Sequence, residues 1–252
     1  MTSAAPEIFD AHFHIIDRRF PLRENNGYLP DEFTADDYLA RVADLGITGG
    51  AVVSGSFQGF DQTYLSDALT TLGPGYVGVT QLPASASEEE IRRLDALGVR
   101  GLRFNIFRGG SESVDNLADF ARRVHDVAGW HVELYADAAD LVDLVPVLVA
   151  LPQISIDHLG MSTEGIPTLL RLVEAGAYVK ATGFGRVSVD VPTVVRQIAE
   201  VNPEALVFGT DLPSTRAKTP FADSDIARLT TALGEENARK ALSENGRRLY
   251  RL

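Results

Sequence analysis

The feature that most constrains the fold of this chain is a regular alternation of short apolar segments with amphipathic ones. Segments typical of buried strands recur eight times, at residues 7–16, 50–54, 76–82, 99–107, 131–136, 154–160, 177–183 and 205–211. Helical patterns fill the intervals at residues 34–46, 62–72, 87–98, 115–128, 138–150, 167–175 and 191–201, and two helices at 223–233 and 235–249 close the chain. Eight strand–helix units in 252 residues predict an α/β fold, the (β/α)8 or TIM barrel, with a doubly wound open sheet as the alternative.

Domain organisation and location follow from composition. No linker or low-complexity stretch divides the chain, so we predict a single domain over residues 1–252 with extra C-terminal helices. The longest apolar stretch, residues 144–151, is too short to span a bilayer and contains Pro146. Residues 1–6 have neither the basic nor the apolar region of a secretory signal. These features predict a soluble, cytoplasmic protein without a membrane partner.

Charge and missing residue types exclude several functions. A net charge of -12 argues against general nucleic-acid binding, so any anionic ligand must meet locally placed arginines. The absence of cysteine excludes disulfides, thiol nucleophiles and thiolate zinc sites. No Gly-x-Ser-x-Gly and no Gly-x-x-x-x-Gly-Lys occurs, which weakens a serine hydrolase and removes a P-loop enzyme. Gly183-x-Gly185 lacks the third glycine of a dinucleotide fingerprint and is discounted.

The first predicted strand carries an unusual set of ionisable groups. Strict alternation places Asp10, His12 and His14 on one face, and the opposite face is apolar, with Phe9, Ala11, Phe13 and Ile15. Closely spaced histidines with a carboxylate suit metal binding or proton transfer. The alternative interpretation is an edge strand with one solvated face.

The other strands add polar residues at their C-terminal ends, where active sites of this barrel collect. Alternation turns Arg103 and Asn105 of the fourth strand, and Glu133 and Tyr135 of the fifth, toward the barrel interior. His158 lies near the end of the sixth strand, on the face of Ile154 and Ile156. The residues expected at one rim are His12, His14, Arg103, Asn105, Tyr135, His158 and Asp211.

Several motifs resemble those of the amidohydrolase superfamily. They are Asp10-x-His12-x-His14, Asp157-His158-Leu159-Gly160 and Gly209-Thr210-Asp211-Leu212-Pro213, in the order expected along a barrel. Three further segments are similar to the branch that contains 2-pyrone-4,6-dicarboxylate lactonase, sulfomuconolactonase and sugar-lactone hydrolases: residues 27–30, 99–105 and 179–183. The resemblance covers essentially the whole chain.

The chain departs from the metal-binding pattern of that superfamily. Binuclear members use a carboxylated lysine or a glutamate on the fourth strand, and many mononuclear members use a histidine at the end of the fifth. Here those strands offer Arg103, Asn105 and Tyr135 instead. His125 lies on a helix and His131 at the opposite strand end, so neither replaces the missing ligand. We predict no obligatory cofactor. The alternative is a single Zn²⁺ bound by His12, His14 and Asp211. Three protein ligands are the usual minimum for a catalytic zinc.

The requirements of lactone hydrolysis suggest catalytic roles for four residues. Asp211 would be the general base, and His12, His14 and His158 would donate hydrogen bonds to the carbonyl oxygen. A helix N-cap is the alternative interpretation of Asp211, and a satisfied core histidine that of His158. Asp10 is expected to orient its histidine neighbours.

Substrate recognition is predicted from arginines near the same rim. Arg103, Arg108 and Arg186 could converge on a carboxylate, although surface arginine is the alternative for Arg108 and Arg186. Lys180 receives no role, because its strand parity is ambiguous. Hydroxyl or amide contacts to the substrate are expected from Tyr28, Ser54, Ser56, Gln58, Asn105 and Tyr135.

Together these features predict a lactonase-type hydrolase that opens a small carboxylated lactone, similar to 2-pyrone-4,6-dicarboxylate, by general-base activation of water. The alternatives are a sugar-lactone hydrolase, a metal-dependent decarboxylase or amidohydrolase on the same barrel, and a non-catalytic ligand-binding barrel. The expected partner is a small anionic or sugar lactone, and a homo-oligomer is an open option.

Overall fold

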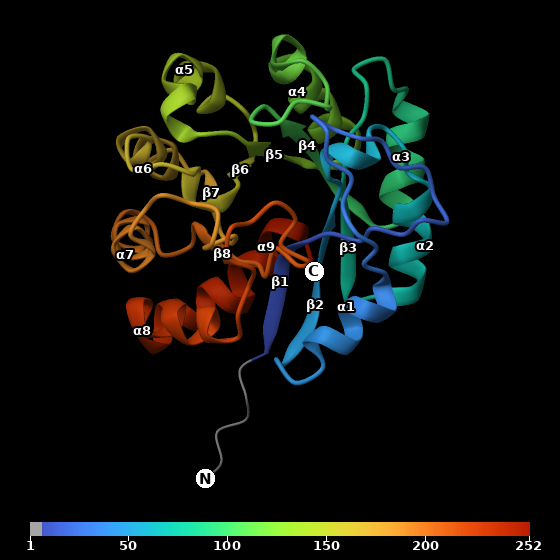
Figure 1. Cartoon of the computed structure of the whole chain (residues 1–252). Coiled ribbons are helices and arrows are strands. Elements are labelled where there is room, and N and C mark those ends of the chain that lie inside the picture. Colours follow the sequence, from blue (N-terminus) through green and yellow to red (C-terminus); the bar gives the residue numbers. More distant parts are fainter. Residues whose placement is uncertain (1–6) are drawn as a thin grey trace.

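Eight parallel strands follow one another around a barrel in chain order (Figure 1). The computed structural model describes residues 7–252, so the prediction about residues 1–6 lies outside the described residues. The strands are β1 (Ile8–Phe13), β2 (Ile47–Val53), β3 (Tyr76–Thr80), β4 (Val99–Asn105), β5 (His131–Tyr135), β6 (Ile154–Ile156), β7 (Tyr178–Ala181) and β8 (Leu206–Phe208). This order confirms the predicted (β/α)8 barrel and excludes the doubly wound open sheet.

The last strand returns beside the first. Just beyond β8, the Asp211 amide donates to the His12 carbonyl at 2.7 Å, and the His14 amide donates to the Leu212 carbonyl at 2.8 Å. Gly209 permits this approach, because a Cβ added there would lie 2.7 Å from the His12 Cβ. The chain therefore brings His12 and Asp211 together through its own backbone.

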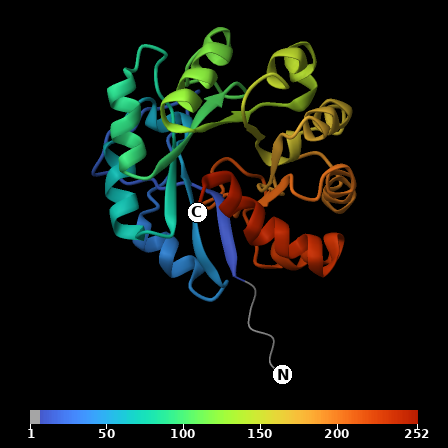
Figure 2. The same cartoon turned by 180° about the vertical axis from the view of Figure 1, so that it is seen from behind.

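Helices form an outer ring around the strands (Figure 2). They are α1 (Ala35–Val42), α2 (Thr63–Leu72), α3 (Glu88–Ala96), α4 (Leu117–Ala128), α5 (Val145–Leu148), α6 (Ile166–Glu174), α7 (Val191–Val201), α8 (Ser224–Arg239) and α9 (Asn245–Tyr250). Thr34 begins α1 with a capping box to Asp37, and the Ser87 side chain caps α3. Among the described helices, none has the length and apolar character needed to cross a membrane.

Two predicted helices differ from the structure for identifiable reasons. Residues 138–150 form a 3-10 segment, Ala138–Leu144, before the short α5, because Pro146 has no N–H for a helical hydrogen bond. The predicted helices at 223–233 and 235–249 meet at Gly234, whose non-helical φ/ψ angles kink α8, and the second one differs in that it passes through a π-helical turn, Lys240–Glu244, before α9.

Two apolar clusters divide the core. One joins the strands to the surrounding helices. The other lies inside the barrel, where alternate residues of β1, β2, β3 and β8 pack against Leu249 and Tyr250 of α9. The C-terminal helix thus contributes side chains to the barrel interior, opposite the rim where the strands end.

Strand β1 departs from strict alternation. Its pairing with β2 shifts register between Asp10 and Phe13, as at a β-bulge. Phe9 and Ala11 belong to the inner cluster, whereas Phe13 and Ile15 belong to the outer one. The prediction that these four residues share one face is therefore wrong, because an extra residue at the bulge reverses the facing of the chain beyond it.

The strands also end earlier than predicted at the rim. Strand β6 stops at Ile156, and His158 follows in a 3-10 turn with φ of 51°. Ile154 and Ile156 face the helices, whereas the His158 ring packs against the rings of His12 and Tyr135. The prediction that His158 shares the face of Ile154 and Ile156 is wrong, since the turn redirects it inward.

Candidate active site

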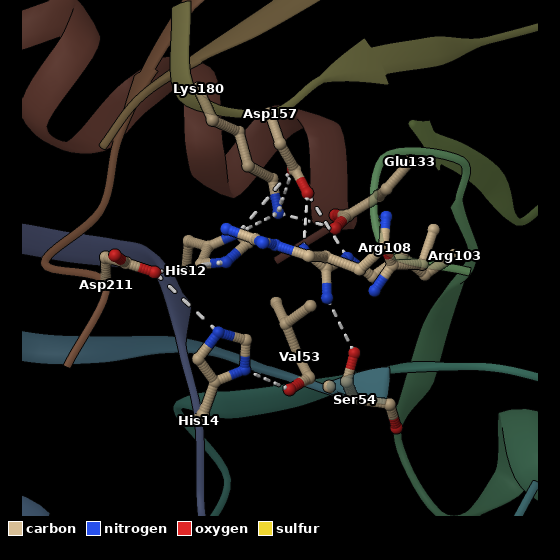
Figure 3. Close-up of polar contacts among 12 residues, drawn as sticks. His12, His14, Val53, Ser54, Arg103, Arg108, Glu133, Asp157, Lys180 and Asp211 are labelled. Atoms are coloured by element: carbon tan, nitrogen blue, oxygen red, sulfur yellow. Dashed lines mark hydrogen bonds and ion pairs between the residues drawn. The ribbon is translucent and has the colours of Figure 1, made fainter. Parts of the chain in front are cut away.

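Four predicted catalytic side chains meet at the C-terminal ends of the strands. Asp211 Oδ1 lies 3.7 Å from Nε2 of His12 and 3.7 Å from Nε2 of His14 (Figure 3). The His158 ring lies 5.0 Å from that of His12, centroid to centroid. All four residues are buried. The structure thus brings together His12, His14, His158 and Asp211, as the sequence predicts.

Unusual backbone angles hold two of these residues. His158 and Asp211 have φ of 51° and 60°, in the left-handed region that non-glycine residues seldom adopt. Gly183, after β7, lets its neighbours approach, because a Cβ there would lie 2.7 Å from His158 Nδ1 and 2.9 Å from Arg186 Nε. The turns after β6, β7 and β8 therefore shape one site.

Several buried polar atoms of this site have no hydrogen-bond partner among the described residues. They are His12 Nε2, His158 Nδ1, Asp211 Oδ1 and the Tyr135 hydroxyl. Buried polar atoms in folded proteins are nearly always paired. Their convergence indicates the place where a ligand or a reacting water is bound.

The charge state of the site follows from burial and from nearby cations. Burial lowers the pKa of His12 and of His158 well below the usual value, and the charges of Lys180 and Arg186 respectively add to this effect. Both imidazoles are therefore neutral at pH 7. Burial would raise the pKa of Asp211, but the charge of Arg186 outweighs it and holds that pKa below its usual range. Asp211 is thus ionised.

His14 presents a lone pair toward Asp211. Its Nδ1 lies 2.7 Å from the carbonyl oxygen of Val53, which can only accept a hydrogen bond. Nδ1 therefore carries a proton, and in the tautomer with this single proton Nε2 presents a lone pair. His14 Nε2 and Asp211 Oδ1 are two acceptors that face each other at 3.7 Å.

A second buried network lies directly beneath the histidines. Lys180 Nζ is 2.6 Å from Glu133 Oε2, 3.3 Å from His12 Nδ1 and 3.9 Å from Asp157 Oδ1. Burial would raise the pKa of Glu133, but Lys180 and His131 together lower it to about 2. The sequence analysis gave Lys180 no role. It placed the Glu133 side chain in the barrel interior but gave it no function either.

Asp157 is also absent from the predicted site. Its Oδ2 accepts from Arg103 Nη2 at 2.7 Å and from Arg103 Nε at 3.2 Å, and Arg103 Nη1 donates to the Ser54 carbonyl at 2.8 Å. Burial raises the pKa of Asp157, although Arg103 opposes the rise. The signal was present in the sequence, since Asp157 directly precedes His158 in the quoted motif.

An open pocket with His14 and His158 in its wall lies at this rim. Four arginines reach its walls: Arg103, Arg108, Arg186 and Arg216. Arg186 Nε donates to Asp211 Oδ2 at 2.9 Å, so both Arg103 and Arg186 already hold protein carboxylates. Arg108 and Arg216 pair with no carboxylate among residues 7–252, which leaves them to meet an anion.

Sequence reasoning missed Arg216. It lies in the loop after β8, donates to the Asn25 carbonyl and lies 4.4 Å from the centroid of the Tyr28 ring. Partial burial and the charge of Arg108 lower its pKa. Its position in a rim loop was the available signal, because such loops carry the binding residues of this barrel.

The remaining predicted contact residues divide into two groups. Tyr135, Asn105 and Ser56 line the pocket, and Tyr28 borders it through Arg216. The Ser54 hydroxyl is hydrogen-bonded to Tyr64 at 2.6 Å on the helix side, and Gln58 bonds the backbone of Ile15 and Gly55. The structure therefore does not bring the Ser54 or Gln58 side chains to the pocket.

Asp10 faces away from the histidine rings. It accepts hydrogen bonds from the His12 and Thr210 amides and from the hydroxyls of Tyr38 and Thr210. Burial raises its pKa to about 6 despite these bonds. Asp10 orients His12 only through the backbone and connects β1 to the loop after β8, because the bulge separates it from the face of the rings.

Comparison with known proteins identifies the family. A family profile described as amidohydrolase matches residues 9–252. The chain belongs to the amidohydrolase family. This confirms the resemblance predicted from the rim motifs.

The relatives of this amidohydrolase include named lactone hydrolases. A 2-pyrone-4,6-dicarboxylate hydrolase of Comamonas testosteroni is 28% identical, with 96% of this chain and 89% of the relative covered. A 4-sulfomuconolactone hydrolase of Hydrogenophaga intermedia is 26% identical, with 97% and 89% covered. A Pseudomonas putida protein solved under the name of a 2-pyrone-4,6-dicarboxylic acid hydrolase is 25% identical, with a TM-score of 0.82 and 98% of both chains covered.

Two groups of side chains in this amidohydrolase have metal-ligand atoms within 4.8 Å of one another among the described residues: His12 with His158 and Asp211, and His12 with Glu133 and Asp157. Lys180 already contacts all three members of the second group. Arg186 neutralises Asp211 in the first, which leaves two neutral imidazoles beside three protein cations. An ion in either group would compete with a protein cation for the carboxylates, Arg186 in the first and Lys180 in the second.

Proposed function

We propose that this amidohydrolase opens a small, carboxylated lactone by hydrolysis. The observation that carries the proposal is the convergence of unpaired, buried atoms of Asp211, His12 and His158 beneath a pocket with two guanidinium groups that pair with no carboxylate among residues 7–252. Hydrolysis of an anionic ester requires a proton acceptor, hydrogen-bond donors for the carbonyl oxygen and groups that bind the anion.

The attacking water would be held by two acceptors. His14 Nε2 and Asp211 Oδ1 face each other at 3.7 Å, and a water placed against both can donate one hydrogen bond to each. Its oxygen lone pairs are then free to attack the carbonyl carbon. This role replaces the predicted one for His14, because the Nδ1–H tautomer has no proton on Nε2.

The carbonyl oxygen would accept hydrogen bonds from His12 and His158. Negative charge develops on this oxygen as the water oxygen bonds to the carbonyl carbon, and donors in a buried site stabilise it. Asp211 takes the proton of the water. The ring C–O bond then breaks, and the same proton passes from Asp211 to the departing oxygen, so that one hydroxy acid forms from one lactone and one water.

The substrate carboxylate would bind Arg108 and Arg216. Guanidinium groups recognise carboxylates through paired, charge-assisted hydrogen bonds. The names of two relatives, 2-pyrone-4,6-dicarboxylate hydrolase and 4-sulfomuconolactone hydrolase, refer to lactones with acidic groups. We propose Arg103 and Arg186 as positioning groups for Asp157 and Asp211 in place of direct carboxylate ligands.

A substrate screen tests the proposal. Purified protein would be incubated with 2-pyrone-4,6-dicarboxylate, 4-sulfomuconolactone and a neutral aldonolactone, with proton release followed before and after treatment with a chelator. We expect turnover of an acidic lactone that survives chelation. Turnover of the aldonolactone alone would favour the sugar-lactone alternative, and activity lost on chelation and restored by zinc would favour the metal-dependent one. Failure to open any lactone would contradict the proposal.

Replacing Arg108 with glutamine tests the anion site. We expect KM for an acidic lactone to rise about 10- to 100-fold, since a hydrogen bond to a charged group contributes about 1.5–3 kcal/mol. Steady-state kinetics would measure the change. Arg122→Gln is the matched control, because Arg122 is exposed on α4 and its one ion pair among residues 7–252 is with Asp119. An unchanged KM in Arg108→Gln would remove Arg108 from the binding site.

The cytoplasmic location, the absence of an obligatory cofactor and the homo-oligomeric option stay predictions. The domain limits of 1–252 also stay a prediction.

A further inference from the structure

Lys180 is a buried lysine at the centre of the barrel. Its side chain has no solvent exposure, whereas Lys218 is exposed and Lys240 half-buried. Lysine is almost never fully buried unless it is paired. The ion pair with Glu133, 2.6 Å away, accounts for the burial, but the third contact, 3.3 Å to His12 Nδ1, lies directly under the proposed reaction site.

The contact with Lys180 determines which nitrogen of His12 carries a proton. An ammonium group has three donors and no acceptor, so His12 Nδ1 must be the acceptor in this hydrogen bond. The neutral ring then carries its proton on Nε2. His12 Nε2 is the unpaired atom that faces Asp211.

Another neighbour favours the opposite tautomer. Asp157 Oδ1 lies 3.6 Å from His12 Nδ1 and could accept a proton from it. That distance exceeds a hydrogen bond, and Arg103 holds the other oxygen of Asp157. Lys180 therefore decides between two tautomers, and Asp157 is the nearest alternative partner if the ammonium group is removed.

We propose that Lys180 is a positioning residue that holds His12 as the Nε2–H tautomer, so that His12 donates a hydrogen bond into the reaction site. The inference rests on the proposed function in one respect, namely that the acceptor is the carbonyl oxygen of a lactone. In the other tautomer His12 would present a lone pair to that oxygen and would repel it.

Glu133 and its partners hold Lys180 in place (Figure 3). Glu133 Oε1 lies 3.0 Å from His131 Nε2 and 2.5 Å from the hydroxyl of Tyr250 in α9. The Tyr250 hydroxyl also lies 3.1 Å from the Ala11 carbonyl oxygen. A continuous set of buried contacts thus extends from the C-terminal helix to the histidine in the reaction site.

Nitrogen NMR of the full chain tests the inference without any substrate. In ¹⁵N-labelled protein at pH 7, long-range proton–nitrogen spectra distinguish protonated from unprotonated ring nitrogens, and His12→Gln assigns the signals of His12. We expect His12 Nδ1 to be unprotonated and Nε2 protonated. A protonated Nδ1, or an even mixture of tautomers, would overturn the proposal.

A double variant tests the role of Lys180 itself. Lys180→Met combined with Glu133→Gln removes both buried charges together, which avoids leaving either one unpaired. We expect His12 to shift to the Nδ1–H tautomer, and kcat to fall about 100-fold with little change in KM, as for loss of one oxyanion donor. Lys240→Met, which removes the ion pair of the π-helical turn with Glu236 of α8, is the control and should change neither.

The two readouts separate this inference from the proposed function. A double variant that keeps the Nε2–H tautomer would overturn the role of Lys180, even if kcat fell. If this variant does not fold, the spectrum of the unmodified chain decides the question. If no lactone is opened but the tautomer is as expected, the proposed function fails and the control of His12 by Lys180 still holds.

Discussion

Asp211→Asn is expected to lower kcat for lactone opening by about 1,000-fold, within the range of about 10²- to 10⁴-fold that general-base catalysis contributes. The amide cannot accept the proton of the attacking water or return it to the departing oxygen. KM should change little, because the groups proposed to bind the substrate are Arg108 and Arg216. Since Arg186 holds the pKa of Asp211 below its usual range, the native enzyme should keep this base ionised throughout pH 5–9. Rate measurements over that range check both points.

The matched control for this variant is Asp223→Asn. Asp223 is an exposed residue paired with Arg41, far from any proposed role in the reaction. It should retain full activity. Melting curves of both variants would show whether the loss of the Asp211–Arg186 pair has changed the fold. Full activity in a folded Asp211→Asn protein would exclude Asp211 as the base.

Glu133→Ala is expected to lower the free energy of unfolding by about 3–5 kcal/mol, the usual effect of removing one partner of a buried ion pair. The substitution leaves the Lys180 ammonium group without its 2.6 Å partner and deprives His131 and Tyr250 of an acceptor. Urea unfolding at pH 7 measures the change. Glu90→Gln, at an exposed pair with Arg93, should cost less than about 1 kcal/mol and serves as the control.

The same contacts predict how the free energy of unfolding depends on pH below 4.5. The pKa of Glu133 is about 2 in the folded protein against an ordinary value of 4.5, so the unfolded chain binds a proton first as pH falls. Glu133 therefore contributes stability that is fully present above pH 4.5 and lost as pH falls toward 2. The difference in unfolding free energy between native and Glu133→Ala protein should shrink over that interval. A difference that stays constant, or no destabilisation at pH 7, would contradict the buried pair.

The sequence predicted the barrel and most of its rim for a simple physical reason. Strand–helix alternation is a local pattern, and the C-terminal ends of parallel strands meet at one rim whatever the details of packing. Alternation also placed Arg103 and Glu133 correctly inward on β4 and β5, because both strands pair in regular register along their length.

Alternation failed where the backbone is irregular. The bulge in β1 turned Asp10 away from the histidines, and the turn after β6 brought His158 inward. Both depend on non-local contacts, since a bulge is defined by the partner strand and a left-handed residue is retained only by surrounding structure. Lys180 was missed because β7 has only four residues, too few for a pattern of period two to decide which side faces in.

The sequence alone determined the chemical groups of this protein and the rim on which they collect. Only the tertiary structure decided how those groups are paired: Arg103 with Asp157, Arg186 with Asp211, and Lys180 with both Glu133 and His12. Such pairing depends on distances of a few ångströms between strands far apart in the chain. Those distances decide which arginines are free for a substrate and which nitrogen of a histidine holds its proton.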